Sequence, residues 1–241
     1  QDGIVNTGKA YTGTHDSPDL NRNLYHALNV DFVRMYQLCC NKITHWIASG
    51  QFAGKVIFEN FINGYFYLYN HLADLPKDAL YIVADKYPEM LQMYKEMIST
   101  LGLDLDILYI ADCDPDYPLR PGCVDLVIDF FSSSEHDFYF PQPYYEAFGA
   151  LLAPDAQVIG TVMTLPAGAK SRPRYHQKYP EGTPHLMDFS HLEGALSALG
   201  YAIKTEEVGA VLKTQDKFSF VCHLNGEKMS FIWYTASRAP K

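Results

Sequence analysis

Two apolar runs, residues 56–58 and 80–84, constrain the fold of this chain more than any other feature. Each run ends on an acidic residue, Glu59 after the first and Asp85 after the second, and a segment of helical length lies between them. Short apolar runs on either side of such a segment are typical of a β-α-β unit whose parallel strands are buried on both faces. Acidic side chains at the carboxyl ends of these strands lie where open α/β sheets bind ligands.

The rest of the chain continues this alternation of strands and helices. Such an alternation predicts an α/β fold with a doubly wound, mostly parallel seven-stranded sheet and right-handed crossovers. An Asn-Gly pair between two alternating runs predicts a hairpin, and therefore an antiparallel edge, near the carboxyl end. The further elements expected are strands at 106–111, 123–131, 157–165 and 201–208, helices at 88–101, 143–152 and 189–199, a turn at 152–156, and hairpin strands at 218–224 and 228–235.

The first 52 residues precede the predicted sheet and form a separate segment. Its beginning is polar and rich in turn-forming residues, whereas apolar residues recur at helical spacing over 24–47. This spacing predicts one or two amphipathic helices. We therefore divide the chain into an N-terminal helical cap, residues 1–52, and an α/β domain, residues 53–241.

Composition excludes several classes of function. The formal net charge of the 241 residues is −9, which argues against nucleic-acid binding by this chain alone, because phosphate neutralisation needs clustered Lys and Arg. Five cysteines without paired metal-site spacing predict free thiols in a reducing compartment, with no metal site. No apolar run reaches membrane-spanning length and no leader pattern is present, so we expect a cytoplasmic protein without membrane contact.

Three stretches resemble the class I S-adenosylmethionine-dependent methyltransferases. Residues 85–91 read Asp-Lys-Tyr-Pro-Glu-Met-Leu, similar to the second motif of that family, an acid followed by a helix that opens with Pro-Glu-Met-Leu. Residues 124–128 read Val-Asp-Leu-Val-Ile, similar to the fourth motif. Asp112, directly after the strand predicted at 106–111, stands at the place of the acid in the third motif.

The first motif of the family, an acid followed by alternating glycines, is matched less well. When the sequence is aligned on Glu59, the glycine places are taken by Phe61, Asn63 and Tyr65, with only Gly64 nearby. Glycines at these places let the backbone approach the cofactor without an intervening Cβ. A Phe and a Tyr therefore bring side chains to positions where the family has bare backbone.

The resemblance implies S-adenosylmethionine as the cofactor and methyl transfer to a small molecule as the activity. In the roles that the family assigns, Glu59 orients the methionine end, Asp85 holds the ribose hydroxyls, and Asp112 with Cys113 holds the adenine. Transfer of a methyl group from a sulfonium depends mainly on positioning the acceptor in line. The residues that the resemblance assigns to the cofactor are Glu59, Asn63, Gly64, Asp85, Lys86, Asp112, Cys113 and Phe130.

The substrate side is expected beyond the strand at 123–131, where family members place residues that face the acceptor. Glu135 and His136 in the polar run 132–137 are the candidate catalytic bases, although a surface loop with capping serines explains the same residues. Residues 166–188 lack a regular period and are rich in basic side chains, which indicates either a lid that binds an anionic ligand or a solvated loop. The substrate-binding candidates are Tyr11, His15, Phe131, Arg172 and Arg174; for Tyr11 and His15, ordinary surface contacts of a packing arm are the favoured explanation.

A second hypothesis is that the chain is a non-catalytic methyltransferase-like domain that senses a ligand. The replaced glycines favour it, and so does the start of the chain at Gln1 without a methionine, which is compatible with a piece of a longer protein. Such a domain could lie behind the DNA-binding domain of a MerR-type transcription regulator. In both readings the partner is a small molecule, as substrate or as effector, and the oligomeric state is open.

Overall fold

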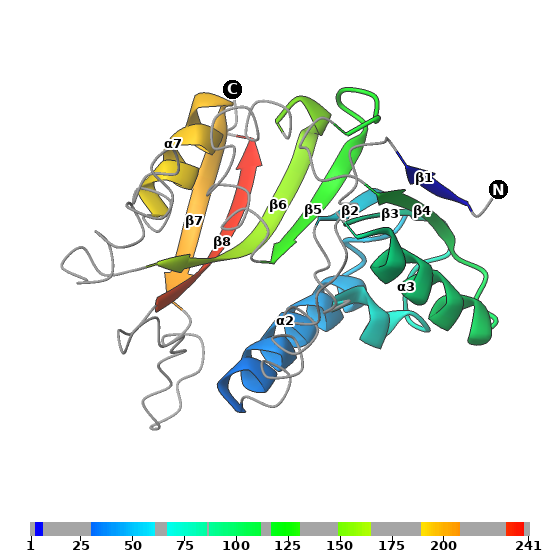
Figure 1. Ribbon diagram of the computed structural model, residues 1–241. Coiled ribbons are helices and arrows are strands. Elements are labelled where there is room, and N and C mark those ends of the chain that lie inside the picture. Colours follow the sequence, from blue (N-terminus) through cyan, green and yellow to red (C-terminus); the bar gives the residue numbers. More distant parts are fainter. Residues whose placement is uncertain are drawn as a thin grey trace. The chain divides into compact units, whose positions relative to one another are not determined.

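The computed structural model describes residues 3–6, 30–60, 67–85, 87–111, 117–130, 149–164, 189–207 and 230–238. The chain, drawn in Figure 1, forms two compact units, Gln1–Pro118 and Leu119–Lys241. In both units strands are accompanied by helices, so the α/β class expected from the sequence is confirmed.

The described part of the first unit contains four parallel strands. They lie side by side in the order β1-β4-β3-β2. The central strand β3 is buried along almost its whole length, as its continuous apolar run predicts for a parallel strand covered on both faces. The strands are β1 (Ile4–Asn6), β2 (Val56–Asn60), β3 (Leu80–Asp85) and β4 (Asp106–Ala111).

Helix α3 (Pro88–Thr100) confirms the predicted helix that follows the second acid. It begins with Pro in its first turn, where the missing N–H leaves no hydrogen bond unmade, and it contacts β1, β3 and β4. Its buried side chains are Leu91, Tyr94 and Ile98. Leu101, the last residue of the helix expected at 88–101, is 52% exposed, because it lies just beyond the last helical turn.

The segment between β2 and β3 differs from the prediction. We expected an α-helix there, and the described part is instead the short 3-10 helix η1 (Tyr67–His71) followed by turns. The N–H of Asp74 donates to the His71 carbonyl at 2.8 Å, which closes a turn where an α-helix would have continued. The longer helix α2 (Val30–Ala48), which the apolar spacing predicted, contacts η1.

Strand β1 was not expected, because the sequence around it is polar and has no strand pattern. Ile4, Val5 and Asn6 pair in register with residues of β4. A three-residue edge strand needs little alternation, since β4 supplies all its hydrogen-bond partners. The N-terminal segment assigned to the cap therefore contributes both a strand and a helix to the first unit.

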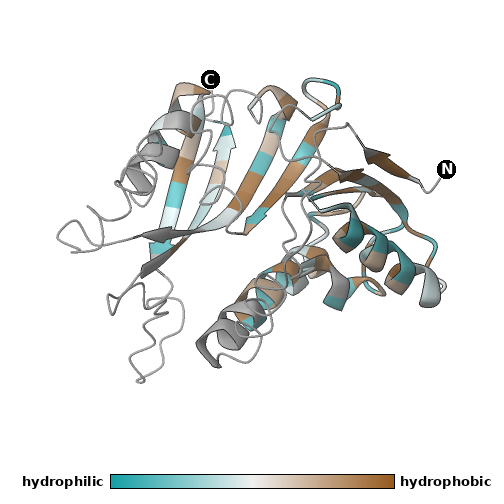
Figure 2. Ribbon diagram, viewed as in Figure 1, coloured by the Kyte–Doolittle hydropathy of each residue, from teal (hydrophilic) through white to brown (hydrophobic). Residues whose placement is uncertain are grey.

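The second unit also presents four strands within its described residues. Their order is β5-β6-β8-β7, in which β5 and β6 are parallel and β8 is antiparallel to both of its neighbours. β5 and β6 are largely hydrophobic (Figure 2). β8 confirms the antiparallel strand expected near the carboxyl end, although β7 and not β8 lies at the edge, and the hairpin strand expected at 218–224 lies outside the described residues. The elements are β5 (Val124–Phe130), β6 (Leu152–Thr164), α7 (Phe189–Ala198), β7 (Tyr201–Glu207) and β8 (Ser230–Arg238).

The turn expected at residues 152–156 is part of β6. Val124 pairs with Leu152, but Leu126 already pairs with Gln157, so the intervening residues of β6 form an irregular bulge against β5. A bulge takes up extra residues without ending the strand, which explains why the turn-like sequence is compatible with a strand here.

Two further expectations concern the whole chain. Cys39, Cys40 and Cys123, the cysteines within the described ranges, form no disulfide with one another. None of the described helices combines the length and the apolar character that a membrane crossing requires.

Candidate functional site

Glu59 and Asp85 lie on one face of the first unit, at the carboxyl ends of neighbouring strands. Glu59 pairs with Val83, and Asp85 lies two residues further along β3 on the same face. With strands about 4.8 Å apart and a rise of about 3.3 Å per residue, their Cα atoms are about 8 Å apart. The structure therefore brings together the two acids that the sequence placed at one edge.

The Glu59 carboxyl is enclosed by the protein and is 1% exposed. Its Oε1 accepts a hydrogen bond from the N–H of Tyr67 at 3.1 Å, and its Oε2 has no hydrogen-bond partner among the described residues. Burial raises the pKa of Glu59 to about 8, although the N–H groups of Tyr67 and Leu68 favour the ionised form and offset part of the rise. At neutral pH this side chain is therefore mostly a protonated, neutral acid.

Asp85 is also completely buried, but its immediate role is different. Its Oδ1 accepts a hydrogen bond from the N–H of Tyr87 at 2.9 Å. This contact closes a tight turn two residues long that leads from β3 into α3. Asp85 thus fixes the direction in which the chain leaves the sheet at the edge where a ligand is expected.

Helix α2 and η1 bring together polar side chains that the sequence did not mark as functional, and one of them, Cys39, interacts with Glu59. Burial raises the pKa of the Cys39 thiol, and the adjacent Cys40 and Glu59 raise it further, which means that Cys39 and Glu59 are close enough to interact. The Asn70 amide donates to the Cys40 sulfur at 3.3 Å. Burial lowers the pKa of His71, opposed by Asp74 and by a hydrogen bond to the Cys40 backbone. Helical spacing placed Cys39 on the buried face of its helix, but nothing in the spacing indicated Glu59 as its neighbour.

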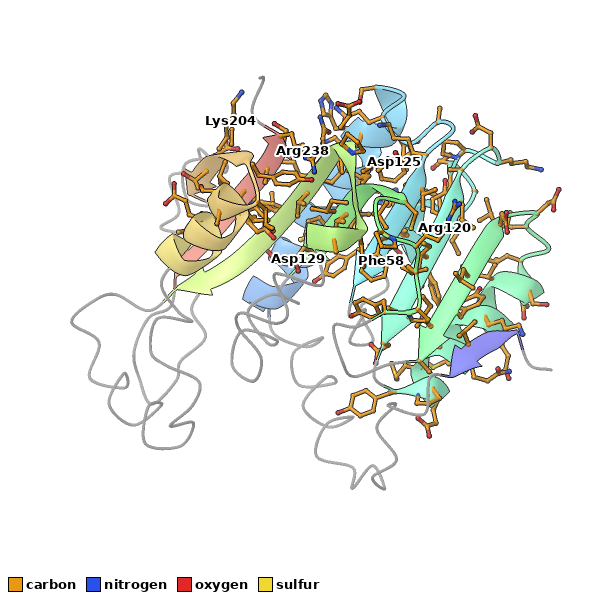
Figure 3. The ribbon with its side chains drawn as sticks, turned by 90° about the horizontal axis from the view of Figure 1, so that it is seen from above. Phe58, Arg120, Asp125, Asp129, Lys204 and Arg238 are labelled. Carbon is orange, nitrogen blue, oxygen red and sulfur yellow. The ribbon has the colours of Figure 1, made fainter. Side chains whose placement is uncertain are left out.

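Phe58, the residue before Glu59, faces the other side of β2 (Figure 3). Its ring meets the ring of Tyr117 edge-on, with centroids 5.1 Å apart. Both rings are buried. The end of β2 is therefore held by an aromatic contact on one face and by the carboxyl contact to Tyr67 on the other.

In the second unit, Asp129 of β5, which Figure 3 labels, is buried, and it accepts a hydrogen bond from the Tyr234 hydroxyl of β8. The next residue, Phe130, was predicted to line the cofactor pocket. It is buried and meets Trp233 edge-on, with ring centroids 5.5 Å apart. Its role toward a cofactor stays a prediction.

Of the other sequence-derived candidates, none falls within the described residues. These are Tyr11, His15, Asn63, Gly64, Lys86, Asp112, Cys113, Phe131, Glu135, His136, Arg172 and Arg174. Across the part of the chain that is described, no three His, Cys, Asp or Glu side chains gather in a way that would hold a metal ion.

No protein-family model matches the chain, and no curated protein matches its sequence. Solved structures match its fold. Phosphoethanolamine N-methyltransferase 2 from Haemonchus contortus, in complex with S-adenosylhomocysteine, aligns with a TM-score of 0.58 at 12% identity, over 78% of this chain and 49% of its own. This chain thus spans about half the length of that enzyme.

Two further matches cover most of both chains. Geranyl diphosphate C-methyltransferase from Streptomyces coelicolor aligns with a TM-score of 0.63 at 8% identity, over 86% of this chain and 81% of its own. The [4+2]-cyclase SpnF aligns with a TM-score of 0.58 at 13% identity, over 83% of this chain and 81% of its own.

The chain therefore has the fold of the class I S-adenosylmethionine-dependent methyltransferases. At these identities the likeness establishes the fold, and the cyclase is a reminder that one fold hosts more than one reaction. These matches give no support to the alternative of a regulator domain.

Proposed function

We propose that this chain binds S-adenosylmethionine at the carboxyl ends of β2 and β3 and transfers its methyl group to a small molecule. The observation that carries the proposal is the pair of buried acids, Glu59 and Asp85, on one face at the ends of adjacent parallel strands. Ligands of open α/β sheets bind at this end of the strands. When bound, S-adenosylmethionine supplies an activated methyl group, and the protein holds donor and acceptor in line.

The described residues fit this ligand at its amino-acid and ribose ends. Glu59 has a buried oxygen that no described residue satisfies, and a buried polar atom of this kind is costly unless a ligand completes it. Asp85 stands at the end of the next strand, the place of the ribose-binding acid in the resembling family. Both acids are held by N–H groups that follow them in the chain, which fixes their orientation before a ligand arrives.

The remaining roles are proposed from the order of the sequence motifs. Asp112 and Cys113 hold the adenine, and Glu135 or His136 removes a proton from a hydroxyl or amine acceptor. Further contacts to the cofactor are assigned to Asn63, Gly64, Lys86 and Phe130, and contacts to the acceptor to Tyr11, His15, Phe131, Arg172 and Arg174.

For the acceptor we favour a small molecule with an anionic group. The segment 166–188 concentrates basic side chains in a chain of net charge −9, and two of the matched enzymes have phosphorylated compounds bound. Methyl transfer should be compared on pairs of acceptors with and without a phosphate. A preference for the phosphorylated member that is lost in the double variant Arg172→Gln, Arg174→Gln supports this assignment, and equal rates on both members contradict it.

Binding is the first test. A ligand present at about 100 times its Kd raises the free energy of unfolding by about 2.7 kcal/mol, so thermal unfolding with S-adenosylmethionine or S-adenosylhomocysteine at about millimolar concentration should show a clear upward shift in Tm. Absence of a shift with either compound contradicts the proposal. Asp85→Asn keeps an acceptor for the Tyr87 N–H but removes the charge, and we expect it to weaken binding about tenfold; Asp85→Ala should abolish it.

A matched control and a turnover assay complete the test. Asp104 is an exposed acid of the same unit, so Asp104→Ala should leave the ligand-induced shift unchanged. His136→Ala should spare binding and reduce methyl transfer. Binding that persists in Asp85→Ala would place the cofactor elsewhere, and binding without transfer to any acceptor would favour a ligand-sensing domain over an enzyme.

A further inference from the structure

Glu59 is a buried acid without a positive counter-charge among the described residues. The groups that face it come from three elements. From η1, the Tyr67 N–H donates to it, and the same element carries the titratable His71; from α2, the Cys39 thiol interacts with it; and from β3, Asp85 shares its face of the sheet. Burial favours the neutral form of the thiol and of the imidazole, so neither supplies a compensating charge.

A buried carboxyl in this situation has two ways to avoid an isolated charge. It can keep its proton, or it can receive a cation from outside the protein. In the unliganded protein the carboxyl keeps its proton, since burial raises the pKa of Glu59 to about 8. The carboxyl can receive a cation when a ligand with an ammonium group reaches Oε2, the oxygen that the described residues leave without a partner.

We propose that Glu59 releases its proton when the ammonium group of an amino-acid-bearing ligand occupies the end of β2, so that ligand binding and proton release are linked. The inference rests on the proposed function for the identity of the ligand and goes beyond it in assigning the linkage. The proton leaves Oε2 for the buffer, the ammonium keeps all of its own protons, and the product is a buried ion pair. No covalent bond other than the O–H of the carboxyl is broken.

The linkage has a definite dependence on pH. The ligand binds the ionised carboxyl, so below the pKa of the free protein its Kd should fall about tenfold for each unit of rising pH. The Kd should reach its lowest value near a pH of about 8, where the free protein is ionised, and should rise again at higher pH as the ammonium group of the ligand loses its own proton. A ligand without an ammonium group should show neither effect.

Titration calorimetry measures the released proton directly. S-adenosylhomocysteine is titrated at pH 7 in phosphate and in Tris, whose ionisation enthalpies differ, and the difference in observed heat gives the number of protons released. We expect close to one proton per ligand bound and a Kd about tenfold lower at pH 7 than at pH 6. 5′-Methylthioadenosine, which carries the nucleoside but no amino acid, should bind with no proton release.

Variants identify the group responsible. Glu59→Gln resembles the protonated acid in shape and keeps an acceptor for the Tyr67 N–H, so we expect it to fold, to bind S-adenosylhomocysteine more weakly and to release no proton. Glu96→Gln changes an exposed acid on α3 and should retain the release. Thermal unfolding of both variants confirms that they are folded.

The outcomes separate this inference from the function on which it rests. Binding of S-adenosylhomocysteine with no proton release, or with a release that persists in Glu59→Gln, overturns the linkage and leaves the proposed function standing. Absence of binding by this compound and by S-adenosylmethionine between pH 6 and pH 9 overturns both.

Discussion

The Tyr234 hydroxyl of β8 donates a hydrogen bond to Oδ2 of Asp129 on β5, although β6 lies between these two strands. The register explains how the two side chains meet. Asp129 pairs with Gly160 of β6, and Gly160 pairs with Tyr234, so the three residues form one row across the sheet. The row has no side chain at its centre, and the tyrosine ring covers the glycine to reach the carboxylate. A buried acid is thereby satisfied by a residue 105 positions away in the sequence.

The first prediction concerns the space above Gly160. A Cβ at this position would lie 2.5 Å from three atoms of the Tyr234 side chain, so Gly160→Ala forces a buried ring to move. We expect a loss of about 1–3 kcal/mol in the free energy of unfolding, measured by urea denaturation.

A second glycine provides the control. No atom of the described residues lies within 4 Å of a Cβ added at Gly194 of α7, so Gly194→Ala should be neutral or stabilising by up to about 1 kcal/mol. In the background Tyr234→Ala the cost of Gly160→Ala should largely vanish. An undiminished cost in that background would mean that the tyrosine ring is not the obstacle.

The second prediction concerns the hydrogen bond itself. Tyr234→Phe keeps the ring over Gly160 but removes the donor to the buried Asp129 carboxyl, which should cost about 1–3 kcal/mol of stability. Tyr109→Phe is the matched control, because burial alone accounts for the raised pKa of Tyr109, with no hydrogen bond contributing. Denaturation curves in which the two variants lose the same stability would contradict the assigned role of the hydroxyl.

The third prediction is a pH dependence of stability that originates from Glu59. The carboxyl ionises at a pH of about 4.3 in an unfolded chain and at about 8 in the folded protein. Between these values the folded state holds one proton more than the unfolded state. The free energy of unfolding should therefore fall as the pH rises, by up to about 1.4 kcal/mol per pH unit, and level off above about 8.

This dependence is tested with Glu59→Gln, which cannot ionise. At pH 4.5 the free energy of unfolding of Glu59→Gln should be similar to that of the unmodified protein. At pH 8.5 it should be clearly greater. Chemical denaturation at both pH values measures the difference. Glu96→Gln, at an exposed position, should follow the unmodified protein throughout. Parallel curves for Glu59→Gln and the unmodified protein would show that Glu59 is ionised in the folded state.

The fourth prediction separates the structural role of Asp85 from its role toward a ligand. Asp85→Ala removes the acceptor for the Tyr87 N–H at the entrance to α3 and should cost about 1–2 kcal/mol of stability without any ligand. Asp85→Asn retains an acceptor and should recover most of that loss. If both variants unfold at the same denaturant concentration, the turn does not depend on this hydrogen bond.

Much of the fold could be predicted because its signals are local. A buried parallel strand is a continuous apolar run, and the runs that became β2, β3, β4 and β5 are visible without any knowledge of their partners. Proline at the first turn of α3 marks a helix start that depends only on neighbouring residues. The expected α-helix before β3 is absent from the described residues, because an aromatic-rich segment of helical length does not reveal the 3-10 turn that it adopts.

The candidate site was predictable in part for the same reason. Glu59 and Asp85 were found because each follows an apolar run, and parallel strands bring their carboxyl ends to one edge. The neighbours of Glu59 could not be found in this way. Cys39 reaches it from a separate helix, and helical spacing shows which face of that helix is buried without showing what covers it.

The sequence by itself determined the α/β class, the alternation of the main strands and helices, and the positions of two acids at strand ends, since these follow from periodicity and from interactions over a few residues. Only the tertiary structure decided that Glu59 is buried and stays protonated, which strand Ile4–Asn6 joins, and that Tyr234 reaches Asp129 across Gly160. These properties depend on strand register and on burial among residues far apart in the chain. Distant contacts leave no periodic signal in a single sequence.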